Sequence, residues 1–307
     1  MLSICIPVYN YDCRKLIIDL QSQIGKNDLP AEINIISDGS EKEYDLLYSN
    51  FCKGFGNLNG LNYTSLDVNK GRSSVRNLLA QQARYNHLLF LDCDSELISE
   101  DFLKLYIQEI DEKIQVICGG RVYPDNCISE NKFLHWKYGV SKESKPLNVR
   151  LAHPFKSFMS NNFLIEKRIF EKIKFDEKIN EYGHEDTLFG FNLEKNGILI
   201  RHINNPVLHG YIESNDVFLD KTKMAVNNLV NIIRSRGTDD KGFINTVSLS
   251  RIYFQIRSFG LSGLLFFTSK IFLQPLSKRI RKNRCGMTAF SIYKLFLFAQ
   301  YYRSENP

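Results

Sequence analysis

The sequence predicts an α/β protein in which a doubly wound, mostly parallel sheet with flanking helices precedes a helical, basic C-terminal extension. Short apolar runs alternate with segments whose apolar residues recur at helical spacing, which is typical of repeated strand–helix units. Four of the runs end in polar residues, and a doubly wound sheet binds ligands beyond the carboxyl ends of its strands. We therefore expect one ligand-binding edge in the first half of the chain.

Strands are expected where apolar runs carry little polar alternation, because strands of a parallel sheet are buried on both faces. Turn-forming residues bound each of these runs. The expected strands of this kind are residues 2–8, 33–36, 88–91 and 116–122, and the more polar residues 61–66 are a candidate for the third strand in chain order.

Helices are expected between the strands. Asp12 is placed to cap the first helix, and Ser99 is placed to cap the fourth. Glu100 and Asp101 should then occupy the first turn of the fourth helix, where the helix dipole favours acids. The first three expected helices cover residues 16–24, 41–52 and 75–84.

The second half of the chain is less regular. Residues 125–155 show no clear period and are expected to form a long irregular segment. Its His135-Trp136 pair either faces a substrate or packs in the core. Further on we expect strands over residues 162–165 and 198–203, helices over 167–173 and 182–195, and helical structure from residue 216 onward.

Cysteine usage and apolar runs restrict the location of the protein. Seven scattered cysteines without a CxxC pair argue against a disulfide framework or zinc cluster and indicate a reducing compartment. No basic segment precedes the first strand, so no export signal is expected. No apolar run reaches the roughly 18 residues that span a bilayer.

Positive charge is concentrated near the C-terminus. The chain carries +6 overall, whereas residues 250–307 alone carry +9. Basic residues between aromatic amphipathic stretches suit an anionic membrane surface. An ordinary helical subdomain with a solvated basic face is the alternative. No nucleic acid is expected as a partner, because no nucleic-acid motif accompanies the charge.

Two aspartates end the fourth expected strand. In HLLFLDCDSEL the apolar run 88–91 is followed by Asp92 and Asp94. Alternate residues of an extended chain point the same way, so both carboxylates could converge on one Mg²⁺ or Mn²⁺ ion. Two solvated acids at a strand end are the alternative.

Five motifs in order now give the sequence a resemblance to the inverting glycosyltransferase family 2, of GT-A fold, over about residues 2–211. Ser37 stands where family members carry the first of two acids, whereas Asp38 keeps the second. The motifs are SICIPVYN, IISDGS, NKGRSSVRN, LDCDSE and GHEDTLFGFNLEKNG.

The resemblance implies a role for each matching residue. Asp94 is expected to bind the metal directly, while Asp92 either lies nearer the ribose or bridges to the metal through water. His209 is expected to be a further ligand, with a structural histidine as the alternative. Asp186 is expected to be the general base, with Glu185 beside it; two acids in a first helical turn are the structural alternative. The expected nucleotide-binding residues are Pro7, Tyr9, Asn10, Asp38, Gly71, Arg76 and Asp92, with Arg72, Asn161 and Asn162 as weaker candidates.

The expected function is metal-dependent transfer of a sugar from a nucleotide-diphosphate donor, with UDP-sugars favoured. The acceptor is expected to be a growing, lipid-linked, cell-surface glycan. A nucleotide-sugar half (1–124), an acceptor half (125–215) and a helical region (216–307) are expected. Residues 250–303 would contact the inner face of the cell membrane from the cytoplasm.

Two other functions would use similar residues. A nucleotidyltransferase also uses paired acids and a metal, but the first strand lacks a Gly-rich signature. A non-catalytic sugar-nucleotide-binding subunit of a glycan-assembly complex is the alternative from a different class.

Overall fold

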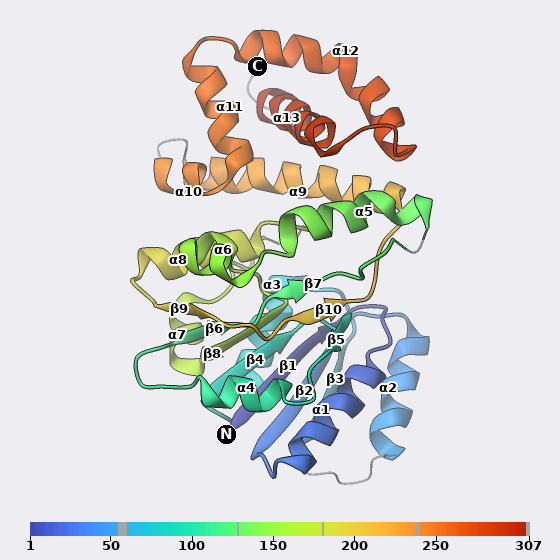
Figure 1. Cartoon of the computed structure of the whole chain (residues 1–307), viewed down its shortest axis with the longest axis vertical. Helices are drawn as coiled ribbons and strands as arrows, with labels where there is room; N and C mark the ends of the chain where they lie inside the picture. The colour runs from blue at the N-terminus through green and yellow to red at the C-terminus, as the bar shows by residue number, and fades with distance from the viewer. Residues whose placement is uncertain (55–59, 128, 180, 238–239, 305–307) are drawn as a thin grey trace. The chain divides into compact units, whose positions relative to one another are not determined.

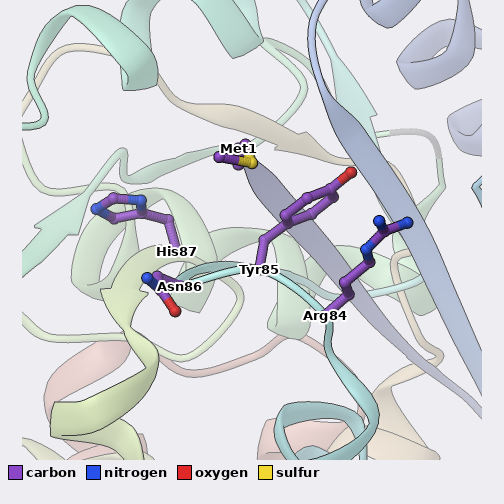
Figure 2. A pocket seen from close by; sticks show the side chains of 5 residues that line it. All are labelled: Met1, Arg84, Tyr85, Asn86 and His87. Atoms are coloured by element: carbon purple, nitrogen blue, oxygen red, sulfur yellow. The ribbon is translucent and has the colours of Figure 1, made fainter.

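A mixed, mostly parallel sheet forms the centre of the computed structural model, which describes residues 1–54, 60–127, 129–179, 181–237 and 240–304 (Figure 1). In these residues seven strands run in the order β3-β2-β1-β4-β8-β6-β9, and only β8 is antiparallel to its neighbours. The predicted fold class is confirmed. The strands are β1 (Leu2–Val8), β2 (Ala31–Asp38), β3 (Leu61–Leu66), β4 (His87–Leu91), β6 (Val116–Cys118), β8 (Asn162–Glu166) and β9 (Ile200–His202).

Helices cover both faces of this sheet, as a doubly wound fold requires (Figure 1). Apolar side chains of α1, α2 and α4 pack on one face, and those of α3, α7 and the C-terminal half of α8 pack on the other. The bounds are α1 (Arg14–Lys26), α2 (Lys42–Gly54), α3 (Arg72–Gln82), α4 (Phe102–Gln108), α7 (Lys167–Ile173) and α8 (Glu185–Lys195).

Strand β4 is apolar at consecutive positions because both of its faces are buried. Leu89 and Leu91 belong to the core cluster on one face, whereas Leu88 and Phe90 belong to the cluster on the other. All four are fully buried, and each such side chain stabilises the fold by roughly 1.5–3 kcal/mol. The strand is therefore fixed in register, and the acids that follow it emerge at one defined place.

The strand predicted over residues 116–122 is wrong, because the chain turns at Gly119-Gly120. β6 ends at Cys118, and β7 (Arg121–Val122) joins a separate three-stranded sheet with β5 (Ser95–Leu97) and β10 (Val207–His209). Gly120 has a φ of 98°, and a Cβ on Gly119 would lie 2.3 Å from the carbonyl oxygen of Asn205.

Both predicted helix caps are also wrong. Cys13 precedes α1, and Asp12 instead accepts a hydrogen bond from the Arg14 N–H at 3.1 Å. Asp101 precedes α4, and the Ser99 hydroxyl accepts from the Asp101 N–H at 3.2 Å. Each side chain thus forms a local turn just before the helix.

The segment 125–155 is mostly helical, contrary to the prediction of an irregular segment. Its helices are too short for a 3.6-residue period to be visible in the sequence. The His135 ring stacks on Phe218 at 4.6 Å and is buried, which favours core packing over a substrate contact. The short helices are η1 (Glu130–Lys132), α5 (Phe133–Tyr138), η2 (Gly139–Glu143), α6 (Leu147–Ala152) and η3 (Phe155–Ser157).

The chain folds into two compact units that interleave in sequence. The first comprises Met1–Pro124, Glu143–Asn180 and Phe189–Tyr211, and the remaining segments form the second. The predicted division at residue 215 stays a prediction. The main helices of the second unit are α9 (Asn215–Arg236), α10 (Lys241–Thr246), α11 (Ser248–Ser258), α12 (Ser262–Arg281) and α13 (Met287–Ser304).

Among the described residues, no helix combines the length and apolar character that crossing a bilayer requires.

We predict that acid destabilises the protein through His202. Its Nε2 lies 2.9 Å from the Pro154 carbonyl and its Nδ1 lies 3.2 Å from Arg150, so the neutral ring is favoured. Burial, together with the positive charges of Arg150 and Lys145, lowers the His202 pKa to about 4.

Below pH 6.5 the unfolded chain therefore binds a proton at His202 that the native protein excludes until about pH 4. The free energy of unfolding should fall by about 3 kcal/mol across this interval because of this group. Urea unfolding between pH 7 and 4 measures the slope. His202→Gln keeps one donor and one acceptor and should make the slope shallower; an equal slope in both proteins would contradict the assignment.

Candidate donor site and acidic turn

Asp38 anchors a loop at the carboxyl end of β2. Its Oδ1 accepts from the Lys70 N–H at 2.7 Å, and its Oδ2 accepts from the Gly71 N–H at 3.0 Å. Asn69 donates to the Asp38 carbonyl at 3.0 Å. Burial raises the Asp38 pKa, although these N–H donors and the Lys70 charge oppose the rise. The structure thus brings Asp38 and Gly71 together, and their role toward a nucleotide base stays a prediction.

The turn after β1 lies against the turn after β2. Asn10 has a φ of 46° and accepts from the Glu41 N–H at 2.8 Å, while its own N–H donates to the Ser40 hydroxyl at 3.1 Å. The neighbouring Tyr9 ring is 55% exposed. An exposed ring beside a fixed loop can stack on a planar base. Pro7 lies inside β1, paired with Ile36 of β2.

A chain of ion pairs surrounds Asp92 at the end of β4. The buried Arg76 of α3 donates from Nη2 to Asp92 Oδ1 at 2.9 Å. Arg121 Nη2 lies 3.5 Å from the other oxygen, Oδ2. The structure therefore brings the predicted residues Arg76 and Asp92 together, and it holds the Asp92 carboxylate between two cations.

Asp94 and His209 also lie together, although 115 positions separate them in the sequence. β5 and β10 pair antiparallel with His209 opposite Ser95, which places His209 Nδ1 3.3 Å from Asp94 Oδ2. Burial alone would raise the Asp94 pKa. The hydrogen bond and charge of His209, with the charges of Arg121 and Arg72, outweigh burial and lower this pKa to about 2. Asp94 is therefore ionised at neutral pH.

Several buried polar atoms at this edge have no hydrogen-bond partner among the described residues, and those of two side chains bear on the site. They are Asp94 Oδ1 and both amide atoms of Asn161, whose side chain is 3% exposed. The Asn161 carbonyl accepts from the Asp92 N–H at 3.1 Å, so Asn161 adjoins the ion-pair chain. Buried polar groups are nearly always satisfied, so these atoms are available to bind water, an ion or a ligand.

Asn162, by contrast, has a structural role. Its Oδ1 accepts from Tyr106, and its amide donates to the carbonyls of Gly120 and Asn205 at 2.9 Å. The side chain holds the glycine turn after β6.

Asp94 and His209 could provide two of the ligands that a divalent cation needs. No group of three or more His, Cys, Asp or Glu side chains forms a metal site within the described ranges. Asp94 offers an unsatisfied carboxylate oxygen beside the His209 imidazole, and both groups suit Mn²⁺. A cation held by two side chains would take its remaining ligands from diphosphate oxygens and water.

The sequence prediction missed Arg121, Tyr123 and Glu143. Arg121 Nη1 donates to Glu143 at 3.0 Å, and the Tyr123 hydroxyl donates to the same carboxylate. The Tyr123 ring lies edge-on to the His209 ring at 5.1 Å, so the network reaches the Asp94–His209 pair. Burial opposes the Arg121 charge, but Glu143 and the neighbouring groups raise its pKa and keep it cationic. Only the Gly119-Gly120 pair hinted that this segment leaves the main sheet.

The acidic turn, residues 181–188, belongs to the second unit and is described within it. Gly183 and His184 both adopt left-handed backbone, with φ of 98° and 68°. α8 then starts with Glu185, which is buried, and Asp186, whose Oδ1 accepts from the Thr187 N–H at 2.6 Å. Burial, with the charge of Lys294, lowers the His184 pKa to about 4, so this ring is neutral at neutral pH.

Helix α9 supports the acidic turn. The Asn228 side chain, which is 5% exposed, donates to the carbonyls of Gly183 and Glu181. A Cβ added to Gly183 would lie 2.6 Å from the Cβ of Ala225. The turn therefore requires both an Asn at 228 and a residue without a side chain at 183.

The family model of Glycosyl transferase family 2 matches residues 3–174, which is more than half of the chain and includes Asp38, Asp92 and Asp94. The chain belongs to glycosyl transferase family 2. It is a glycosyltransferase, and the predicted family is confirmed.

Two bacterial polysaccharide synthases are similar in sequence. The glycosyltransferase is 28% identical over 236 residues to the chondroitin synthase of Pasteurella multocida (strain Pm70), covering 66% of this chain and 24% of that protein. It is 25% identical over 244 residues to the chondroitin synthase of Escherichia coli, and this match covers 68% of this chain and 34% of that protein. The chain thus spans about a third or less of these relatives.

A solved structure supports the fold alone. The mannosyltransferase PcManGT of Pyrobaculum calidifontis, solved in complex with GDP-Man and Mn²⁺, is 11% identical with a TM-score of 0.56. The alignment covers 99% of this glycosyltransferase and 86% of that chain.

We predict that Gly183→Ala impairs the acidic turn. The left-handed φ and the contact with Ala225 should lower the free energy of unfolding by roughly 1–3 kcal/mol. Gly25→Ala in α1 is the matched control, because nothing lies within 4 Å of its added Cβ and Ala favours helix. Urea unfolding of both variants measures the effect. Equal stability of the two variants would refute this account of Gly183.

Proposed function

We propose that the glycosyltransferase transfers one sugar from a nucleotide-diphosphate donor to a hydroxyl of a growing cell-surface glycan. The observation that carries the proposal is that buried polar atoms of Asp94 and Asn161 lack a hydrogen-bond partner beside the Arg76–Asp92–Arg121 chain. These groups lie beyond the carboxyl ends of parallel strands, where such sheets bind ligands. Similarity to chondroitin synthases supports glycan synthesis as the process.

The donor nucleotide is assigned to the loops after β1, β2 and β4. The exposed Tyr9 ring stacks on the base, and Asp38 accepts from an N–H of the base with a lone pair left by its loop contacts. This pattern favours a UDP-sugar. Asn10 and Gly71 fix the loops, Pro7 is the penultimate residue of β1, and Arg76 orients Asp92 toward the ribose.

Asp94 and His209 would hold Mn²⁺ or Mg²⁺. When bound, the cation supplies Lewis-acid stabilisation of the negative charge that develops on the leaving diphosphate. Arg121 is anchored by Glu143 beside Asp92, and its fixed positive charge adds to this stabilisation. Asn161 offers donors and an acceptor for the ribose or the donor sugar.

Asp186 is assigned as the general base that takes the proton of the acceptor hydroxyl as this oxygen attacks the anomeric carbon. The bond from that carbon to the diphosphate breaks as the new glycosidic bond forms, so configuration inverts and no covalent enzyme intermediate forms. Glu185 lies beside Asp186 in the first turn of α8, where it would bind the acceptor or tune the base.

A lipid-linked acceptor at the inner face of the cell membrane suits the charge of the chain. No Asp or Glu occurs between Lys241 and Ser304. A strongly basic region of this kind favours peripheral contact of residues 250–303 with anionic lipids from the cytoplasm.

We predict that a UDP-sugar with Mn²⁺ or Mg²⁺ raises the melting temperature of the protein. A ligand at 100 times its Kd stabilises the native state by about 2.7 kcal/mol. A thermal-unfolding screen of UDP-, GDP- and dTDP-sugars, with metal or with EDTA, measures this effect. Asp94→Asn should lose the metal-dependent part of the shift, whereas the exposed Asp67→Asn should keep it.

If no nucleotide raises the melting temperature with either metal, the donor-site assignment is wrong. If a nucleotide sugar raises the melting temperature equally in EDTA and with metal, Asp94 and His209 do not bind a metal that the donor requires.

We predict that Asp186→Asn lowers the rate of sugar transfer roughly 100-fold or more, because general bases contribute this much. Donor-induced thermal stabilisation should be retained. Glu194→Gln, on the exposed side of the same helix, is the matched control and should transfer sugar like the wild type. Transfer to glycan acceptors is measured by nucleotide release and product mass. An Asp186→Asn enzyme that retains transfer would exclude Asp186 as the base.

A further inference from the structure

The outward face of α12 is apolar, although solvent-facing sides of helices are normally polar. Leu264, Phe267 and Ile271 are 60%, 62% and 51% exposed. Their spacing of three and four residues places them on one side of the helix. The opposite side carries the buried Ser269 and Ser277 and packs within the second unit. In Figure 1, α13 lies between α9 and α12.

Basic residues continue the same side of the helix toward its C-terminus. Lys278 follows Ile271 by two helical turns, beyond Pro275, and the C-cap residue Lys282 follows Lys278 by four residues. Helical spacing thus places both near the line of the apolar side chains. Arg279 lies next to this line and is also exposed. Two further exposed apolar side chains, Phe259 (79%) and Phe272 (53%), extend the apolar area.

The described residues leave these positive charges without an acidic partner. Within the described ranges, no acidic side chain lies within 4.0 Å of Lys278, Arg279 or Lys282. The neighbouring Arg281, in contrast, pairs with Asp216 at 2.8 Å. The acid-free stretch from Lys241 to Ser304 offers no local partner either. The surface therefore combines exposed apolar side chains with unneutralised cations.

We propose that this surface docks on an anionic lipid bilayer, with Leu264, Phe267 and Ile271 inserted at the interface and Lys278, Arg279 and Lys282 on lipid headgroups. We call these six residues the α12 face. The proposal rests on the proposed function, because it identifies the surface by which the enzyme meets a lipid-linked acceptor.

Charge and hydrophobicity together select a lipid surface as the occupant. A second copy of the chain would bring six like charges together, which opposes a symmetric dimer through this face. A nucleic acid would use the basic residues but has no use for an exposed Leu-Phe-Ile stripe. Apolar insertion with flanking Lys and Arg is the pattern of interfacial helices, and α12 does not meet the requirements for crossing a bilayer.

The test measures co-sedimentation of the full chain with phosphatidylcholine vesicles, with and without about 30% phosphatidylglycerol. The wild type should bind the anionic vesicles and bind neutral ones at least tenfold more weakly, because each basic residue contributes about fivefold to affinity. Phe267→Glu/Ile271→Glu should weaken anionic binding at least tenfold. Lys278→Gln/Arg279→Gln/Lys282→Gln should do so too, and should remove most of the salt dependence.

Matched controls come from the first unit. Leu46→Glu changes an apolar side chain that is 63% exposed, and Lys42→Gln/Lys53→Gln/Lys104→Gln removes three exposed lysines. Neither should change vesicle binding. If Phe267→Glu/Ile271→Glu melts at a lower temperature than the wild type, the vesicle experiment is repeated with the uncharged variant Phe267→Ser/Ile271→Ser.

The proposal is overturned if the wild type fails to bind anionic vesicles, or if the α12 variants bind them as the wild type does. It is also overturned if light scattering shows a wild-type dimer that Phe267→Glu/Ile271→Glu converts to a monomer. Preferential binding of single-stranded RNA over vesicles would overturn it as well. Nucleotide-induced thermal stabilisation without vesicles reports on the proposed function separately, and it should be the same in wild type and α12 variants.

Discussion

The buried guanidinium of Arg76 is the constraint on which the donor site depends. A charge inside a protein core is costly unless it is paired and hydrogen-bonded, and Asp92 pairs with the Nη2 of Arg76, while the Phe175 ring lies against the guanidinium. Asp92 in turn faces Arg121, whose charge is balanced by Glu143. The buried Arg76 is thus linked through ion pairs to three parts of the chain. These are Asp92 after β4, Arg121 in β7, and Glu143 at the end of η2. Removing any one partner would leave an uncompensated buried charge.

Most of the sheet could be predicted from the sequence, because the strands that form it are buried on both faces. β1 and β4 appear as apolar runs whose bounds agree closely with the structure, whereas β3 is more polar and only partly buried. Asp38, Asp92 and Asp94 follow such runs, so their placement at one edge was predictable from the parallel order of the strands. Arg76 and Asp92 belong to consecutive elements, and their contact follows from the short connection between α3 and β4.

The remainder of the site depends on contacts between residues that are distant in sequence. Arg121 reaches Asp92 only because the chain turns at Gly119-Gly120 and leaves the main sheet, and a run such as Val116 to Val122 gives no sign of that turn beyond its glycines. The partnership of Arg121 with Glu143 joins two segments without a common pattern. The short helices of residues 130–152 are stabilised by packing against other elements, for example by the stacking of His135 on Phe218. Their own sequences are too short to show a helical period.

Helix α9 connects two features of the second unit that the proposals treat separately. Near its middle, Asn228 holds the acidic turn that carries Glu185 and Asp186. Less than two turns later, Arg234 donates to the carbonyls of Tyr301 and Tyr302 at the end of α13, which packs against α12. The acidic turn with the acid proposed to activate the acceptor, and the helix that carries the surface proposed to contact lipid, therefore both pack against α9. An acceptor whose sugar chain is attached to a lipid would be recognised at both of its ends by a single folded unit.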